Sequence, residues 1–167
     1  MRLFKETLKY LLTIFIVIFI VIYVARFQQI IGPSMSPNLE DGNVILVSRI
    51  HTHFFRARRG DIIAFLQDDR HLIKRIIGLP GEYIEFKNNY LYINGNPFEE
   101  LYISTNTDDF SLTNLGYEII PEGMFLVLGD NREDSLDSRD FGLIQESDIA
   151  GRAILRIWPI NRFKLIR

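Results

Sequence analysis

Two residues in this chain have the right types and surroundings to form a nucleophile and its general base. The first is Ser34, in the segment Gly32-Pro33-Ser34-Met35-Ser36-Pro37, where the two prolines stiffen the backbone and disfavour a helix. A serine hydroxyl becomes an effective nucleophile only when a neighbouring base removes its proton. On this segment alone, a solvated serine in a surface turn is the simpler interpretation.

The second residue is Lys74, at the centre of a predicted strand over residues 71–77. Because side chains alternate along a strand, Lys74 shares one face with Leu72 and Ile76. Burial among aliphatic side chains disfavours the ammonium form and lowers the pKa of a lysine from about 10.4. A neutral amine can then act as a general base. The alternative, and the commoner case for a lone lysine in a strand, is a packed stem whose ammonium reaches water.

A third polar stretch, residues 129–142, follows directly after a predicted buried strand. It contains Ser135 and Ser138, which can hydrogen-bond to neighbouring groups, and the oppositely charged Asp137 and Arg139, which can clamp a loop. In isolation the stretch is equally compatible with a solvated polar loop.

Composition and charge limit the classes of function. The chain has 167 residues, 47% of them hydrophobic, with no cysteine and a formal net charge of −2. This length suits one domain with an appendage, and the lack of cysteine excludes disulfides and thiolate chemistry. The charge gives no case for a nucleic-acid partner. His51 and His53 lie two apart, but no third ligand is evident nearby, so we predict neither a metal site nor a cofactor.

An apolar run near the N-terminus predicts a membrane anchor. Residues 10–25 carry no charge and would span roughly 24 Å as a helix, against a bilayer core of about 30 Å. We predict a transmembrane segment over residues 10–26, a cytoplasmic N-terminus over residues 1–9, whose charges are mainly positive, and an exoplasmic domain over residues 27–167. A cleavable signal peptide is the alternative, but no Ala-x-Ala pattern precedes a cut near residue 25.

Beyond the anchor the sequence predicts short strands separated by turns, typical of a mainly β domain. The expected architecture is a distorted β-barrel or packed antiparallel sheets with one N-terminal transmembrane helix. No other helix is expected, and strand patterns near residues 101–103 and 117–120 are weak. We predict strands over residues 43–49, 61–67, 71–77, 83–87, 90–93, 124–128 and 149–157.

Together these stretches resemble type I signal peptidases, the bacterial-type serine/lysine leader peptidases that remove signal peptides from secreted preproteins. Ser34-Met35-x-Pro37 is similar to the nucleophile motif of that family, and residues 60–63 are similar to its next motif. Residues 74–81 resemble the motif that carries the general base, and residues 129–142 resemble the last one. The order of these motifs and the N-terminal anchor also agree.

The resemblance implies a role for each matching residue. Ser34 would attack the scissile carbonyl, and Lys74 would take the hydroxyl proton and return it to the leaving amine. Ser135 would orient the Lys74 amine, while Asp137 and Arg139 would form a supporting ion pair. The main-chain N–H of Ser34 would donate to the oxyanion.

The sequence departs from the family pattern at a few positions. Gly32 stands where some members have a serine that supplies a second oxyanion donor, and Pro33 has no N–H to replace it. Asn38 and Glu82 replace a usual threonine and a usual aspartate, and we expect both to be tolerated. A lysine base is typical of the bacterial and organellar branch, and the short connection between the last two motifs suggests a reduced core.

The resemblance also implies the substrates and the location of the protein. We expect preprotein signal peptides with small residues one and three positions before the cut. Ile31, Met35, Leu39 and Ile73 flank the catalytic pair in sequence and are predicted to line the substrate pockets. The other expected partners are the lipid bilayer and the secretion translocon. The predicted location is the plasma membrane, with a single span and the catalytic domain outside.

Two other functions remain open at this stage. One is a dedicated serine/lysine maturation peptidase with a narrow substrate; a self-cleaving repressor would need a DNA-binding module, whereas this chain has an apolar run. The other is an inactive membrane-tethered β module, against which the presence of both Ser34 and Lys74 argues. Arg56, Arg58 and Arg59 form either a solvated loop or a patch that contacts lipid headgroups.

Overall fold

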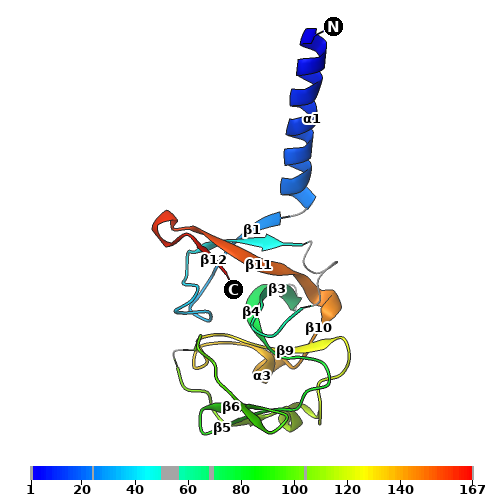
Figure 1. The fold of residues 1–167 in the computed structure, drawn as a ribbon. Coiled ribbons are helices and arrows are strands. Elements are labelled where there is room, and N and C mark those ends of the chain that lie inside the picture. The colour runs from blue at the N-terminus through cyan, green and yellow to red at the C-terminus, as the bar shows by residue number, and fades with distance from the viewer. Residues whose placement is uncertain (1, 24, 50–56, 68–69, 104, 167) are drawn as a thin grey trace.

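A helix projects from a β domain built of two antiparallel sheets in the computed structural model, which describes residues 2–23, 25–49, 57–67, 70–103 and 105–166 (Figure 1). The helix α1 spans Arg2–Tyr23 and leads directly into the first strand. The mainly β, antiparallel architecture predicted from the sequence is therefore confirmed.

The larger sheet has eight strands in the order β1-β2-β11-β3-β4-β9-β10, with β12 paired to β11. Among the described strands this path is open, with β1 and β10 at its ends, so a closed barrel is not formed. At one end of the path, the two residues of β10 pair with Phe125 and Met124 of β9. The strands are β1 Ala25–Gln29, β2 Val44–Ser48, β3 Ile62–Gln67, β4 Arg70–Gly78, β9 Met124–Leu128, β10 Ile144–Gln145, β11 Ile149–Trp158 and β12 Lys164–Leu165.

The smaller sheet has four strands in the order β7-β6-β5-β8. Asn88 and Asn89 connect β5 to β6 with positive φ angles of 51° and 68°, as a two-residue hairpin turn requires. The weak strand patterns near residues 101–103 and 117–120 do not correspond to strands in the structure. The strands are β5 Ile84–Lys87, β6 Tyr90–Ile93, β7 Asn96–Phe98 and β8 Phe110–Ser111.

The predicted anchor differs from the observed helix at both ends. α1 begins at Arg2, whereas Ala25 and Arg26 belong to β1 and pair with Ser48 and Val47 of β2. Sheet pairing thus takes the last two residues of the predicted segment. The described side chains of α1 over residues 10–18 are exposed. Within the described residues, no helix combines the length and apolar character needed to cross a membrane.

Short helices occur where only loops were expected. The helix α3, Ser138–Phe141, lies inside the polar stretch after β9, and Asp137 caps its N-terminus. Three 3-10 turns span Leu112–Leu115, Glu146–Asp148 and Ile160–Arg162. These elements are too short to show an amphipathic repeat, which explains why the sequence pattern missed them.

Strand β4 is the centre of the core because it contributes to three hydrophobic clusters. Ile73 packs in the cluster that contains Met35 and Leu39. Ile77 packs between the two sheets, and Ile76 packs with Phe65 in the third cluster. The predicted catalytic lysine is therefore carried by a strand whose neighbouring side chains are fixed in the core.

Candidate active site

Ser34 lies in a tight turn between β1 and β2. Two main-chain hydrogen bonds close the turn, from Ser36 N to Pro33 O at 2.9 Å and from Leu39 N to Met35 O at 2.8 Å. Met35 and Leu39 are 0% and 2% exposed and fix the turn from below, whereas Ser34 is only half-buried. Core packing thus holds the backbone of Ser34 while its side chain stays accessible.

Lys74 lies in the buried part of β4, opposite Ile63 of β3, and is 3% exposed. Burial lowers the pKa of the Lys74 amine to about 8, and the negative charge of Asp137 limits this decrease. Leu72 and Ile76 both belong to the same apolar cluster as Ile63, so this face of the strand is apolar as predicted. An appreciable fraction of the amine is therefore neutral just above neutral pH.

The two residues line one cleft of about 540 Å³. Ile31, Met35 and Ile73, three of the predicted pocket residues, line the same cleft. Ile31 is 88% exposed at its rim, whereas Met35 and Ile73 are buried in its wall. Leu39 instead lines a second cavity of about 480 Å³ together with Asn38 and Arg156. The structure thus brings three of the four predicted pocket residues to the Ser34–Lys74 cleft.

Ser135 approaches the Ser34 turn through Gly129. A β-carbon at Gly129 would lie 2.2 Å from Ser135 Oγ and 2.4 Å from Ser34 O, so only glycine fits there. The Ser135 hydroxyl is buried and has no hydrogen-bond partner within the described part of the chain. A buried polar atom of this kind calls for an explanation.

Asp137 and Arg139 form the predicted ion pair. Asp137 is 0% exposed, and its carboxylate accepts from Arg139 Nε at 2.8 Å and from Arg139 Nη2 at 2.9 Å. The same carboxylate accepts from Gly129 N at 3.0 Å. The pair therefore fixes the backbone at the point where Gly129 contacts Ser34 and Ser135.

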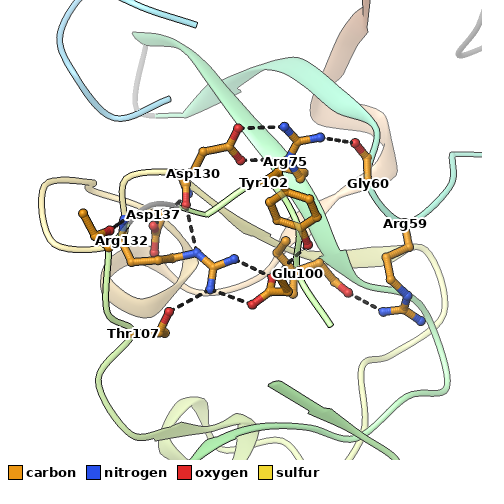
Figure 2. A network of polar contacts seen from close by, with 12 residues as sticks. Arg59, Gly60, Arg75, Glu100, Tyr102, Thr107, Asp130, Arg132 and Asp137 are labelled. Carbon is orange, nitrogen blue, oxygen red and sulfur yellow. Dashed lines mark hydrogen bonds and ion pairs between the residues drawn. The ribbon is translucent and has the colours of Figure 1, made fainter. Parts of the chain in front are cut away.

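A second buried ion pair was not predicted from the sequence. Asp130 accepts from Arg75 Nε at 2.7 Å and from Arg75 Nη2 at 2.6 Å, while Arg75 Nη1 donates to Gly60 O at 2.8 Å (Figure 2). Arg75 directly follows Lys74 in β4, and Asn131, next to Asp130, donates its N–H to Ser34 O at 3.1 Å. This pair thus links the strand of Lys74 to the turn of Ser34.

A third pair joins this region to the segment after β7. Arg132 donates to both carboxylate oxygens of Glu100, at 2.5 Å and 3.1 Å, and to Gly129 O at 3.0 Å. Tyr102 donates to Glu100 at 2.8 Å, and its ring lies under the Arg75 guanidinium, 4.2 Å from ring centre to Cζ (Figure 2). Burial raises the pKa of the Tyr102 hydroxyl, which therefore stays protonated. Arg75 lies in the motif over residues 74–81, and Asp130 and Arg132 lie in the motif over residues 129–142. Their ion-pair partners are evident only from the fold.

The N–H of Gly32 already donates a hydrogen bond within the domain. It donates to Asp41 Oδ1 at 2.7 Å, and the positive φ of 83° at this residue favours glycine. Gly32 therefore supplies neither a side-chain nor a main-chain donor to an oxyanion in this conformation.

The remaining sequence candidates are less informative. His51, His53 and Arg56 lie outside the described residues. Arg59 pairs with Glu82 and donates to Ile77 O, so its guanidinium is bound within the domain. In the part of the chain that the structure describes, no group of three His, Asp or Glu side chains is placed to hold a metal ion.

Comparison with known proteins identifies the family. The model of the family "Signal peptidase, peptidase S26" matches residues 4–158. Signal peptidase IB of Staphylococcus aureus is 36% identical over 179 aligned positions, covering 96% of this chain and 94% of the relative. Signal peptidase I of Leptolyngbya laminosa is 41% identical over 149 positions, covering 83% of this chain and 71% of the relative.

A solved structure agrees with these relatives. The crystal structure of a signal peptidase I from Enterococcus faecalis V583 has a TM-score of 0.54 and 41% sequence identity, covering 58% of this chain and 96% of that chain. Sequence, fold and the cleft that contains Ser34 and Lys74 point the same way. This chain therefore belongs to the signal peptidase family, peptidase S26.

Proposed function

We propose that this serine endopeptidase, a signal peptidase I that removes signal peptides, works through a dyad of Ser34 and Lys74. One observation carries the proposal: a buried lysine with its pKa lowered to about 8 lines the same cleft as a serine held in a rigid turn. A nucleophile next to a base of matched pKa is the arrangement that acyl transfer requires.

In the proposed reaction, the neutral Lys74 amine takes the proton of Ser34 Oγ as the oxygen attacks the scissile carbonyl. The new ammonium then gives this proton to the leaving amine, which departs as the N-terminus of the mature protein. A water molecule attacks the resulting ester, Lys74 accepts its proton, and the ester oxygen recovers a proton to regenerate Ser34. Atoms and charges balance over the cycle, and only these two side chains exchange protons.

The surrounding residues support this chemistry. The main-chain N–H of Ser34 is the proposed oxyanion donor. Ser135 is proposed to orient the Lys74 amine, a role that would give its buried and otherwise unpartnered hydroxyl a hydrogen bond. Asp137 and Arg139 hold the loop beneath them.

Two free strand edges provide a route to substrate recognition. β1 is the terminal strand of its sheet, and residues 70–74 of β4 precede the point where β9 begins to pair. Residues from both strands line the cleft. We propose that an extended peptide pairs with these edges, so that its first and third side chains before the cut point into the wall formed by Met35 and Ile73. Buried aliphatic walls leave room for small residues such as alanine.

The membrane assignment rests on the apolar run over residues 10–23, the uncharged part of α1. Its described side chains, up to residue 18, are exposed, and those of residues 19–23 lie outside the described part. An exposed helical segment whose side chains are predominantly apolar is stabilised by an apolar environment. We propose that this run anchors the protein once in the plasma membrane with residues 1–9 in the cytoplasm, and that the translocon delivers its substrates there.

A dedicated maturation peptidase remains the second candidate for the substrate range. Incubating the purified full-length protein in detergent with several unrelated preproteins distinguishes a general signal peptidase from a dedicated maturation peptidase. A general signal peptidase should cut each preprotein at the end of its signal peptide, as N-terminal sequencing of the product would show. Cleavage of one preprotein alone would favour the narrow enzyme, and cleavage of none would contradict the proposal.

A further inference from the structure

Asn38 connects separate parts of the site through its side-chain amide and its main-chain carbonyl. Asn38 Nδ2 donates to Asp130 Oδ2 at 3.0 Å and to Tyr102 O at 2.6 Å. Asn38 O accepts from Arg156 Nη1 at 2.9 Å. These contacts tie the Ser34 turn to the loop after β9, to the segment after β7 and to β11.

The adjacent residues Asp130 and Asn131 hold the Ser34 turn at both ends. Asn131 N donates to Ser34 O at 3.1 Å, and Asp130 accepts from the side chain of Asn38, four residues further along. The hydrogen bond from Leu39 N to Met35 O closes the turn between these points. Loss of the Asn38 amide would therefore break the link between this end of the turn and Asp130, while the main-chain bonds of the turn remain.

The same carboxylate is bound to the strand that carries the base. Asp130 is 0% exposed, and both of its oxygens accept from Arg75, the residue after Lys74 (Figure 2). The charge of Asp130 is also one of those that raise the pKa of Lys74. Asn38 thus reaches, through one buried carboxylate, the strand that holds the proposed base.

We infer that Asn38 is a positioning residue that fixes Ser34 relative to Lys74, an inference that rests on the dyad proposed above. An asparagine amide has two donor protons, one for each of its acceptors here. Serine or threonine has one donor proton and a shorter reach, so neither could hold both. Asn38 lines the second cavity and not the substrate cleft, so it acts on the geometry of the reaction and not on binding.

The test is a comparison of kcat and KM for Asn38→Ala, Asn38→Ser and the wild-type full-length protein in detergent. We expect kcat to fall about tenfold or more in both variants, because small displacements of a nucleophile are costly in rate. KM should stay within about twofold, since the cleft lining is unchanged. A merely structural role would lower the folded fraction, measured by circular dichroism, without changing the kcat of the folded enzyme.

Asn96→Ala is the matched control, because Asn96 also donates its side-chain amide to a main-chain carbonyl, at 3.3 Å, but does so in the smaller sheet. It should keep wild-type kcat and KM. If Asn38→Ala does not fold, Asn38→Ser decides: a wild-type kcat in the folded variant would overturn the inference. Activity in Ser34→Ala, or none in the wild type, would overturn the dyad and this inference together. An inactive Ser34→Ala with a fully active Asn38→Ala would overturn this inference alone.

Discussion

Gly129 and Ser135 are in such close contact that no side chain can be added between them. A β-carbon at Gly129 would lie 2.2 Å from Ser135 Oγ, and 2.4 Å from the main-chain oxygen of Ser34. Rotation moves the Ser135 hydroxyl but not its β-carbon, which would lie 2.6 Å away, and the Ser34 carbonyl can move only if the turn that carries the nucleophile moves. This contact makes the position of Ser34 depend on Gly129, almost a hundred positions later in the chain.

Gly129→Ala should therefore reduce kcat/KM about a hundredfold or more, because the added methyl displaces the nucleophile. Overpacking should also lower the free energy of unfolding by about 1–3 kcal/mol. Cleavage kinetics and thermal unfolding of the same samples measure both effects. Gly95→Ala is the control, because Gly95 has a positive φ of 78° with nothing within 4 Å of its β-carbon. It should lose stability but keep its kcat, and a fully active Gly129→Ala would show that the turn can shift without consequence.

The lowered pKa of Lys74 predicts how activity depends on pH. Because the neutral amine is the base, kcat/KM should rise with pH, with a midpoint near the Lys74 pKa of about 8. A pH profile with a substrate that does not titrate in this range checks the prediction. A profile that is flat across this midpoint would argue against Lys74 as the base.

The same pKa predicts a dependence of stability on pH. The pKa of Lys74 falls from 10.5 to about 8 on folding, so between these values the unfolded chain binds the proton and the folded chain does not. The lysine therefore destabilises the fold below pH 8, and this cost is relieved as pH rises toward 10.5, by at most about 3 kcal/mol. The difference in unfolding free energy between Lys74→Met and the wild type should shrink over this window. An unchanging difference would mean that Lys74 is solvated in the folded state.

The Asp137–Arg139 pair should affect stability and activity together. Replacing Asp137 with alanine removes the acceptor of Arg139 Nε and of the Gly129 N–H, and leaves the Arg139 guanidinium, within the described residues, only its bond to Arg132 O. Breaking a buried pair costs about 3–5 kcal/mol, and the freed loop should also misplace Ser135. Thermal unfolding and kcat of Asp137→Ala test this, with exposed Asp134→Ala in the same loop as control. A stable but inactive Arg139→Ala would point to a direct catalytic role for that arginine.

Sequence patterns predicted the elements whose signature is local. The strand over residues 124–128 has the predicted bounds, and β3 and β4 differ from prediction by only one residue at some ends. β1 was missed because Ala25 ends an apolar run and Arg26 follows it directly, and both become part of a strand only by pairing with β2. β12 was missed because its two residues, Lys164 and Leu165, are too few to show an alternating pattern, and they form a strand only by pairing with β11.

For the candidate site, too, the sequence showed features within short stretches but not contacts between distant ones. Ser34, Lys74, Asp137 and Arg139 were predicted because their stretches, taken together and in order, resemble the motifs of one family, whereas each stretch alone was ambiguous. The partners of Arg75 and Arg132, namely Asp130 and Glu100, lie 55 and 32 residues away in the chain. No local pattern encodes such pairs. Leu39 was assigned to the substrate cleft because it is near Ser34 in sequence, but the turn directs it to the other cavity.

Ile73 should limit the size of the residue accepted before the cut. Ile73 is 8% exposed and lines the cleft beside Lys74. Ile73→Ala would therefore enlarge the cleft at this point. The variant should cleave a preprotein with leucine before the cut better, relative to alanine, than the wild type does. Ratios of kcat/KM for alanine, leucine and phenylalanine substrates measure this selectivity. Unchanged ratios would exclude Ile73 from the substrate pocket.

The central claim is that Ser34 and Lys74 act as one catalytic unit. The most direct measurement is the kcat/KM for one preprotein with the wild type, Ser34→Ala, Lys74→Ala and the double variant, each shown to be folded. We predict that each single variant loses at least about 10³-fold and that the double variant is little worse than either, because the groups work as a unit. Full activity in Lys74→Ala, or losses that multiply in the double variant, would contradict the account.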